Sequence, residues 1–302
     1  MGIALAHCWQ RRRCSRATVK RILLAVLVLL LGVLAWSIGF EPGWLQQRQL
    51  RLAAPGWAGP PLTIAVAADF HVGAPHAGLP MLRRVVREIN AAHPDIILLP
   101  GDFVIHGVLG GQPVAPESIA GELALLKAPL GVFAVLGNHD WWLDGERVRK
   151  ALETVGIRVI DNHALPLPGA EDRLWLAGIG DDMTDHADPA RAFAGVPADA
   201  KLLVIMHDPA NAAALPPQTL VAFAGHTHGG QVRLPFVGAL ITPGRAPREQ
   251  AWGWIPDVPA ATWVTAGIGT SILPIRFNCP PETVVLRLGG NEAMRETGAP
   301  GR

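Results

Sequence analysis

Histidine, aspartate and asparagine side chains follow five apolar segments of this 302-residue chain, at the point where each segment ends. Their nitrogen and oxygen donors, with no cysteine nearby, suit divalent cations such as Mn, Fe or Zn rather than a soft metal. Seven donors are too many for one tetrahedral ion. They suit two ions that share a carboxylate, and such a pair can activate water and hold the oxygens of a transferring group. The seven are Asp69, His71, Asp102, Asn138, His207, His226 and His228.

The apolar segments before these donors have the length and composition of short buried strands. Strands are expected at 62–68, 95–100, 131–136, 174–179, 202–206, 220–224, 262–266 and 283–288, and helices at 79–92, 117–127 and 141–152. In the first half, strands alternate with helices, which favours βαβ units. Because ligand crevices in open α/β sheets lie beyond the carboxyl ends of the strands, the donors are expected to meet along one sheet edge.

These segments resemble the calcineurin-like metallophosphoesterase superfamily, in its bacterial membrane-associated phosphodiesterase branch. The resemblance covers about residues 61–289 and rests on five motifs in the family's order. They are Asp69-Phe-His71, Gly101-Asp102, Gly137-Asn138-His139-Asp140, Met206-His207 and Gly225-His226-Thr227-His228. The resemblance implies an α/β fold (α+β-like, four-layer), with two central mixed β-sheets sandwiched by helices and one transmembrane helix before them.

The resemblance also implies a role for each donor around two divalent ions. Asp69, His71 and His228 would hold the first ion, Asn138, His207 and His226 would hold the second, and Asp102 would bridge them. His139 would be catalytic rather than a ligand, stabilising the transferring phosphoryl group or protonating the leaving oxygen. The implied reaction is hydrolysis of a phosphodiester or pyrophosphate by in-line attack of a metal-bridging hydroxide. The glycines before Asp102, Asn138 and His226 would let the chain turn tightly.

Departures from the family's pattern narrow the branch. Protein Ser/Thr phosphatases extend the second motif to GDxxDRG, whereas residues 101–106 are Gly-Asp-Phe-Val-Ile-His. Purple acid phosphatases need a tyrosine ligand, and this chain has no tyrosine. What remains resembles small bacterial phosphodiesterases, some of which cleave the pyrophosphate of UDP-diacylglucosamine, so a lipid-linked or envelope substrate is expected. The alternatives are a nuclease or phosphomonoesterase of the same superfamily, and a non-catalytic, membrane-tethered binding protein that kept the fold.

An uncharged apolar run, Ile22–Phe40, lies near the N-terminus. As a helix it would be roughly 28 Å long, close to the thickness of a bilayer's hydrocarbon core. Residues 1–21 carry six basic and no acidic side chains. The positive-inside rule therefore predicts a single-pass protein of the inner membrane, with a cytoplasmic N-terminus and a periplasmic catalytic domain. A cleaved signal peptide is the alternative, although its apolar core would be shorter.

Beyond residue 21 the chain has 20 basic and 25 acidic residues, and this balance lacks the positive surplus that binds nucleic acid. A phosphate-containing small molecule or lipid is therefore the expected partner, together with the membrane itself. The expected organisation is a basic N-terminus (1–21), a transmembrane anchor (22–40), a Pro- and Gly-rich linker (41–60), the phosphoesterase domain (61–289) and a polar tail (290–302).

Several other residues have a structural interpretation beside a functional one. Asp140 would orient a metal-binding histidine or cap a helix. Trp141 and Trp142 are expected to pack in the core rather than wall a substrate cleft. Arg276 would pair with a substrate phosphate or form a structural salt bridge. Five histidines without a patterned partner are expected in loops or on the surface: His76, His93, His106, His163 and His186.

Overall fold

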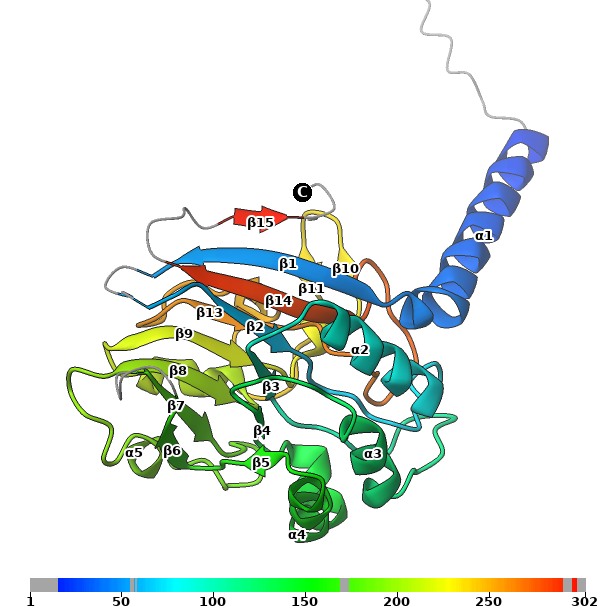
Figure 1. Ribbon diagram of the computed structural model, residues 1–302. Coiled ribbons are helices and arrows are strands. Elements are labelled where there is room, and N and C mark those ends of the chain that lie inside the picture. The colour runs from blue at the N-terminus through cyan, green and yellow to red at the C-terminus, as the bar shows by residue number, and fades with distance from the viewer. Residues whose placement is uncertain (1–15, 55–56, 58, 169–173, 290–294, 298–302) are drawn as a thin grey trace, which may run out of the picture.

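The structure is a computed structural model that describes residues 16–54, 57, 59–168, 174–289 and 295–297 (Figure 1). Its helices are α1 (Arg16–Gly39), α2 (Leu79–Ala91), α3 (Pro116–Leu123), α4 (Asn138–Thr154) and α5 (Pro189–Ala192). Short 3-10 helices are η1 (Glu41–Gly43), η2 (Pro209–Ala214), η3 (His228–Gly230) and η4 (Arg248–Gln250).

Two mixed sheets carry the domain. The seven-stranded sheet has the order β15 (Arg295–Thr297), β1 (Gln46–Ala53), β14 (Glu282–Gly289), β2 (Leu62–Val66), β3 (Ile96–Leu99), β4 (Val132–Ala134) and β5 (Arg158–Val159). The six-stranded sheet has the order β12 (Gly253–Trp254), β13 (Thr262–Val264), β9 (Thr219–Ala224), β8 (Lys201–Met206), β7 (Leu174–Ile179) and β6 (His163–Pro166). A separate hairpin joins β10 (Arg233–Leu234) and β11 (Gly238–Ala239).

Three apolar layers hold the sheets and helices together. Between the sheets, Phe133 of β4 lies in one buried cluster with Phe223 of β9 and Trp263 of β13. A second cluster joins the outer face of the first sheet to α2, α3 and α4, and a third joins the outer face of the second sheet to α5 and η2. Figure 1 shows α2, α3 and α4 together on one side of the domain and α5 on the other. The predicted four-layer fold is confirmed.

The apolar runs form strands because both faces of each sheet are covered. In β2, Ile64 and Val66 face the cluster between the sheets, while Ala65 contributes to the cluster beneath the helices. A strand buried on both faces needs apolar residues at consecutive positions, and this is the pattern that predicted it. β2, β3 and β4 are parallel neighbours, as are β7, β8 and β9. The loops after these strands can therefore gather at one end of each sheet.

The prediction of a linker at 41–60 is wrong at its centre, where eight residues form a strand. Residues 46–53 form β1, which pairs in parallel with β14 over all eight residues. Leu50 and Leu52 are buried between the sheets, while Gln49 and Arg51 are exposed. This alternation is typical of a half-buried strand, but its polar residues and its Pro- and Gly-rich flanks concealed it. The predicted polar tail likewise contains β15, antiparallel to β1.

A chain that begins at residue 61, the predicted domain boundary, should therefore fail to fold well. It loses Leu50 and Leu52, whose burial contributes about 1.5–3 kcal/mol each, and it uncovers the edge of β14, a site for aggregation. We expect low soluble yield and a lower melting temperature for residues 61–302 than for residues 41–302, followed by circular dichroism. Equal melting temperatures would show that β1 is dispensable.

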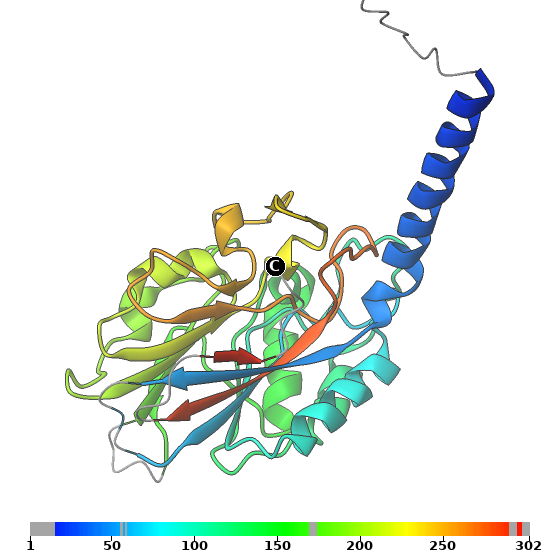
Figure 2. The ribbon, with the colours of Figure 1, turned by 90° about the horizontal axis from the view of Figure 1, so that it is seen from above.

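Helix α1 projects from the domain with almost all of its apolar side chains exposed (Figure 2). Residues 16–43 include the one described segment that is long and apolar enough to cross a membrane, with a mean hydropathy of 2.7 over its most apolar 18 residues. Its base is fastened to the domain. The backbone N–H of Arg276 donates to the Ser37 carbonyl at 2.9 Å, and that of Cys279 donates to the Glu41 carboxylate at 2.6 Å.

Candidate metal centre

The predicted donors sit in strained loops that follow the strands. Asp69, His71, Asp102, His226 and His228 all have positive φ angles, between 39° and 69°. This left-handed conformation is unfavourable for residues other than glycine. Such strain is retained where the surrounding structure imposes it, and it clusters at functional sites.

Two of the preceding glycines are required for different reasons. Gly101 has a φ of +87°, as the predicted tight turn requires. Gly137 instead has an extended backbone, with φ −102° and ψ 178°. A Cβ at Gly137 would clash with the Asp102 carboxylate and the His207 ring. The prediction of a tight turn is therefore wrong at Gly137, where glycine is needed for space.

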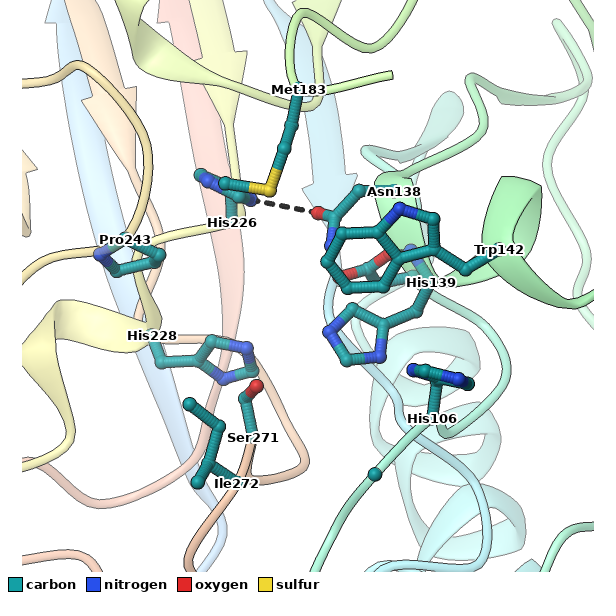
Figure 3. A pocket seen from close by; sticks show the side chains of 12 residues that line it. His106, Asn138, His139, Trp142, Met183, His226, His228, Pro243, Ser271 and Ile272 are labelled. Atoms are coloured by element: carbon teal, nitrogen blue, oxygen red, sulfur yellow. Dashed lines mark hydrogen bonds between the residues drawn. The ribbon is translucent and has the colours of Figure 1, made fainter.

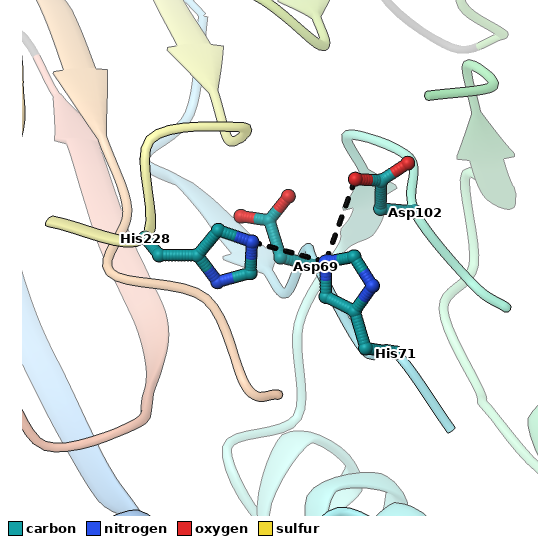
Figure 4. A group of neighbouring side chains, drawn as sticks. All are labelled: Asp69, His71, Asp102 and His228. Atoms are coloured by element: carbon teal, nitrogen blue, oxygen red, sulfur yellow. Dashed lines mark hydrogen bonds and ion pairs between the residues drawn. The ribbon is translucent and has the colours of Figure 1, made fainter. Parts of the chain in front are cut away.

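A first group of donors comprises Asp69, His71, Asp102 and His228 (Figure 4). Each offers one ligand atom, and the four atoms lie within 4.8 Å of one another. The Nε2 atoms of His71 and His228 are 3.0 Å apart, and His71 Nε2 lies 3.5 Å from Asp102 Oδ2. All four side chains are buried. The motifs after β2, β3 and β9 thus meet at one point.

A second group shares Asp102 with the first and adds His207 and His226. His207 Nε2 lies 3.3 Å from Asp102 Oδ2 and 3.2 Å from His226 Nδ1. The Oδ1 atom of Asn138 lies 3.1 Å from His207 Nε2 and 3.0 Å from His226 Nδ1. All seven predicted donors therefore converge, and the only side chain common to both groups is the carboxylate that was predicted to bridge.

The geometry of these donors fits bound cations. Nε2 of His71 faces Nε2 of His228, and Asp69 Oδ2 is buried without a hydrogen-bond partner. A buried carboxylate oxygen without a partner is costly, and when both rings carry their proton on Nδ1 the two Nε2 lone pairs also face each other. A divalent ion in the first group would resolve both problems, because each donor could then direct a lone pair at positive charge. The residue types match a hard or borderline ion.

Groups behind the donors orient two of the rings, one through a hydrogen bond and the other through a nearby carboxylate. His207 Nδ1 donates to the Pro100 carbonyl oxygen at 2.7 Å, so Nε2 is the ring atom that faces the site. For His226, Nδ1 faces the site while Nε2 lies 3.8 Å from Asp208 Oδ2. Asp208 was not predicted from the sequence, although it directly follows the motif residue His207.

Replacing Asp208 with asparagine tests whether its carboxylate orients the His226 ring. The amide removes the negative charge that favours a proton on His226 Nε2, but it keeps an oxygen for the Ala210 N–H, which the Oδ1 atom now accepts at 2.8 Å. Loss of such an outer partner typically costs 10–100-fold in metal affinity, and we expect about that loss for one of two ions. Metal titration followed by atomic absorption would measure it. Unchanged affinity for both ions would exclude the orienting role.

Asp140 positions the loop that carries the bridging carboxylate. Its oxygens accept backbone N–H bonds from Asp102 at 2.9 Å, Phe103 at 2.9 Å, Val104 at 3.2 Å and Gly137 at 3.0 Å. Burial, with Asp102 nearby, raises the pKa of Asp140 to about 8, while the N–H donors act in the opposite direction. The bond from Gly137, the N-cap residue of α4, agrees with the predicted capping role, whereas no bond of Asp140 orients a histidine among the described residues. The other three bonds reveal a role that was not predicted. Asp140 holds the turn in which Asp102 adopts its left-handed conformation.

Burial and mutual charge control the protonation of the donors. Burial lowers the pKa of His71 and of His226 to about 3, which keeps both rings in the neutral form that binds metal. Burial raises the pKa of Asp69 to about 7, although His207 opposes this. Burial also disfavours charge on His207 and Asp102, but the attraction between them dominates: it raises the pKa of His207 well above the usual value and holds that of Asp102 well below. A cation that binds here would displace the proton they share.

A pocket of about 310 Å³ opens above the donors (Figure 3). Asn138, His139 and Trp142 line one side, facing His226 and His228 across the opening. The His139 backbone N–H donates to Asp102 Oδ1 at 2.9 Å, while its ring Nδ1 is buried without a partner. Burial lowers the pKa of His139, against the opposing effect of Asp102. The ring is thus a neutral group at the pocket wall, able to donate or accept a proton.

Three residues differ from their expected roles, two at the pocket and one buried in the domain. Trp142 was expected in the core, but it is exposed and lines the pocket, 4.9 Å from the His139 ring. His106, expected as a surface residue without a role, also lines it, at 6.2 Å from that ring. Arg276 is buried and donates to the carbonyl oxygens of Cys279, Ala266, Gly267 and Gly269, so it does not reach a substrate, and it forms no salt bridge with the described residues. His106 and Arg276 lie in loops and Trp142 lies in α4, so none of the three has the strand-end pattern that identified the donors.

The other unpatterned histidines agree with their predicted placement. His76, His93, His163 and His186 are exposed. Trp141 packs against the core beneath α4, as expected, and stacks on His186 at a ring distance of 3.6 Å. Cys279 is a buried free thiol, whereas Cys8 and Cys14 lie outside the described residues.

The fold and the paired donor groups define a class, the metal-dependent hydrolases that use two neighbouring ions. Comparison with known proteins narrows it. Residues 62–230 match the calcineurin-like phosphoesterase family. Phosphodiesterase YaeI of Escherichia coli is 29% identical over 92% of this chain and 98% of its own length. The uncharacterized metallophosphoesterase YkuE of Bacillus subtilis is 31% identical over 68% of this chain and 72% of its own length. The UDP-2,3-diacylglucosamine pyrophosphatase LpxG of Chlamydia trachomatis is 25% identical over 83% of this chain and 92% of its own length.

The chain belongs to the calcineurin-like phosphoesterase family. It is a phosphoester hydrolase of a family that works with a dinuclear divalent metal centre, and its fold brings together two candidate ligand groups for that centre.

Proposed function

We propose that this protein is a membrane-anchored phosphodiesterase or pyrophosphatase that acts on a lipid-linked or envelope phosphate ester. One observation carries the proposal: two donor groups share Asp102 beneath an open pocket. In the proposed assignment, Asp69, His71 and His228 hold one ion, Asn138, His207 and His226 hold the other, and Asp102 serves both. The ions would be Mn, Fe or Zn.

The protein's own residues would divide the remaining work. When bound, a pair of divalent ions supplies a nucleophile from water at neutral pH and neutralises charge on the phosphate. The Asp102 carboxylate sets the spacing between the two donor groups. His139, neutral and directed into the pocket, would donate a proton to the leaving oxygen or a hydrogen bond to the phosphoryl group. Trp142, Met183 and Ile272 give the pocket an apolar wall for the organic part of the substrate.

Three observations favour a lipid-linked substrate. Helix α1 would keep the pocket near a bilayer. The pocket has apolar as well as polar walls. A relative that spans most of this chain carries the name UDP-2,3-diacylglucosamine pyrophosphatase. UDP-diacylglucosamine is therefore the first compound to test.

A substrate panel with defined metals tests the proposal. We expect the purified full-length protein in detergent to hydrolyse bis-p-nitrophenyl phosphate with added Mn²⁺ and to lose this activity after chelation. Among natural compounds, lipid pyrophosphates should be turned over faster than soluble phosphodiesters. Turnover of the soluble compounds alone would reject the lipid-linked substrate, and a protein that takes up no metal would reject the proposed site.

The proposed topology is single-pass in the inner membrane, with the domain on the periplasmic side. The basic residues before α1 support this orientation. Added protease should therefore digest the domain in intact spheroplasts. Protection until the membrane is lysed would reverse the assignment.

A further inference from the structure

Large apolar side chains are exposed on two loops beside the pocket. One loop contains the β10–β11 turn and the residues after it, and the other precedes β14 along the chain. Phe236 is fully exposed, and Ile241 and Ile272 are 77% and 71% exposed. We call the set the apolar rim, and it consists of Phe236, Val237, Ile241, Ile272 and Leu273. Large apolar side chains exposed on neighbouring loops are typical of an interaction site.

Two rim residues are held outward in strained conformations. Phe236 has a φ of 65° and Ile272 a φ of 61°. Positive φ is unfavourable for bulky side chains and most of all for β-branched ones such as isoleucine. Since both side chains are exposed, packing inside the domain does not repay this strain. Contact with a partner outside the domain would offset this strain.

The two loops form one surface because hydrogen bonds join them. The Arg233 N–H donates to the Phe277 carbonyl and the Phe277 N–H to the Gln231 carbonyl, both at 2.9 Å. The Ser271 N–H donates to the Gln231 side-chain oxygen at 2.6 Å. Ser271 and Ile272 also line the pocket. The apolar rim is therefore continuous with the pocket mouth.

The loop before β14 is also hydrogen-bonded to the base of α1. Arg276 and Cys279 donate their backbone N–H groups to Ser37 and Glu41 at the end of that helix. In both ribbon views, the loop before β14 runs beside the base of α1, and the β10–β11 hairpin lies next to that loop, nearer the middle of the domain (Figures 1 and 2). The apolar rim thus has a fixed place relative to α1, the one described helix that could enter a membrane.

The charge around the rim suits an anionic bilayer surface. Residues 231–250 contain three arginines, Arg233, Arg245 and Arg248, and one acidic residue, Glu249. Arg245 is largely exposed, with one carboxylate, that of Asp182, at 3.5 Å. Apolar side chains flanked by basic ones are the composition that binds at the headgroup level of anionic membranes.

We infer that the apolar rim inserts into the surface of the bilayer that α1 enters, so that the pocket mouth opens onto the lipid headgroups. This inference rests on the proposed function and deepens it, because a pocket held there takes phosphate esters whose apolar part stays in the membrane. The occupant of the rim is the bilayer surface; a second copy of the chain is the competing occupant.

Fluorescence quenching in membranes tests the insertion without any need for turnover. The full-length chain, with Cys8→Ser and Cys14→Ser, would carry a polarity-sensitive fluorophore on Phe236→Cys or, as a control, on Leu125→Cys, which is also exposed but lies after α3. The vesicles would contain phosphatidylethanolamine and phosphatidylglycerol, with or without spin-labelled lipid. We expect the probe at 236 to lie roughly 5–10 Å deep, so that its emission shifts to the blue and is lost to the spin label. The probe at 125 should do neither.

Three outcomes would overturn the inference. The first is the same unquenched, water-like emission at both positions. The second is a blue shift at 236 without lipid quenching, which would identify a protein partner such as a second copy. The third comes from the variant Phe236→Asp/Ile241→Asp, which should slow turnover of vesicle-embedded substrate and leave bis-p-nitrophenyl phosphate turnover unchanged; equal turnover of the embedded substrate would contradict insertion. Absence of turnover in the parent protein would reject the proposed function alone, since the quenching result stands apart from it.

Discussion

Replacing Asp102 with asparagine should abolish hydrolysis while leaving the fold intact. The amide keeps an oxygen for the His139 N–H, which Asp102 Oδ1 accepts at 2.9 Å, and asparagine tolerates the φ of 56° found here. It removes the one negative charge common to both donor groups. Metal ions contribute several kcal/mol of transition-state stabilisation, and about 1.36 kcal/mol is a factor of ten in rate. We therefore expect kcat/KM for bis-p-nitrophenyl phosphate to fall about 1,000-fold or more.

Metal analysis of the same variant separates the bridging role from a general loss of structure. We expect both ions to be lost or weakened together, because Asp102 belongs to both groups. Asp102→Ala should show the same loss, with added backbone strain from alanine at positive φ. Asp199→Ala, at an exposed carboxylate, is the matched control and should retain full activity. An Asp102→Asn protein that keeps both metals and its activity would dismiss the proposed site.

Replacing His139 with glutamine should reduce turnover without removing metal. The ring lies in the pocket wall, and its Nδ1 has no partner among the described residues. General acid–base groups typically contribute 10²–10⁴-fold, and we expect a loss in kcat of that size for substrates with poor leaving groups. The loss should be much smaller for p-nitrophenyl esters, whose leaving group needs little protonation. Comparing kcat across leaving groups would measure the difference.

Two results would contradict this role for His139. Loss of metal in the glutamine variant would make His139 a ligand or a structural support. An equal loss of kcat with good and poor leaving groups would exclude proton donation and favour stabilisation of the phosphoryl group. His163→Gln, at an exposed histidine of β6, serves as the control and should not change kcat.

Most of the candidate site could be predicted from the sequence because its donors obey one rule. Each donor follows a strand that is buried on both faces, so a continuous apolar run in the sequence marks its position. Asp208 escaped because its role depends on the orientation of the His226 ring, which is set by folding. His106 escaped because loop conformation alone brings it to the pocket, and Trp142 escaped because its apolar type favoured the core although the start of α4 places it at the pocket. The role of Asp140 in holding the Asp102 turn could not be predicted either, because its four N–H partners come from two loops that only the folded chain brings together.

The fold was predictable where strands are buried on both faces and unpredictable at the edge of the sheet. β7 spans the predicted 174–179, because its residues are apolar at almost every position. β1 was mistaken for a linker, because alternate residues such as Gln49 and Arg51 face solvent. Its partner β14 supplies the hydrogen bonds, and no local pattern near residue 50 records that pairing.

The short, fastened junction between α1 and β1 has a further consequence. Only six residues separate Gly39 from Gln46, and η1 occupies half of them, with Glu41 bonded to the domain. A span joined in this way has no slack, so the domain would keep one height and one tilt and would turn only about the membrane normal. Encounters with substrate would then follow lateral diffusion in two dimensions, and esters dissolved in the bulk or carried far above the surface would be out of reach.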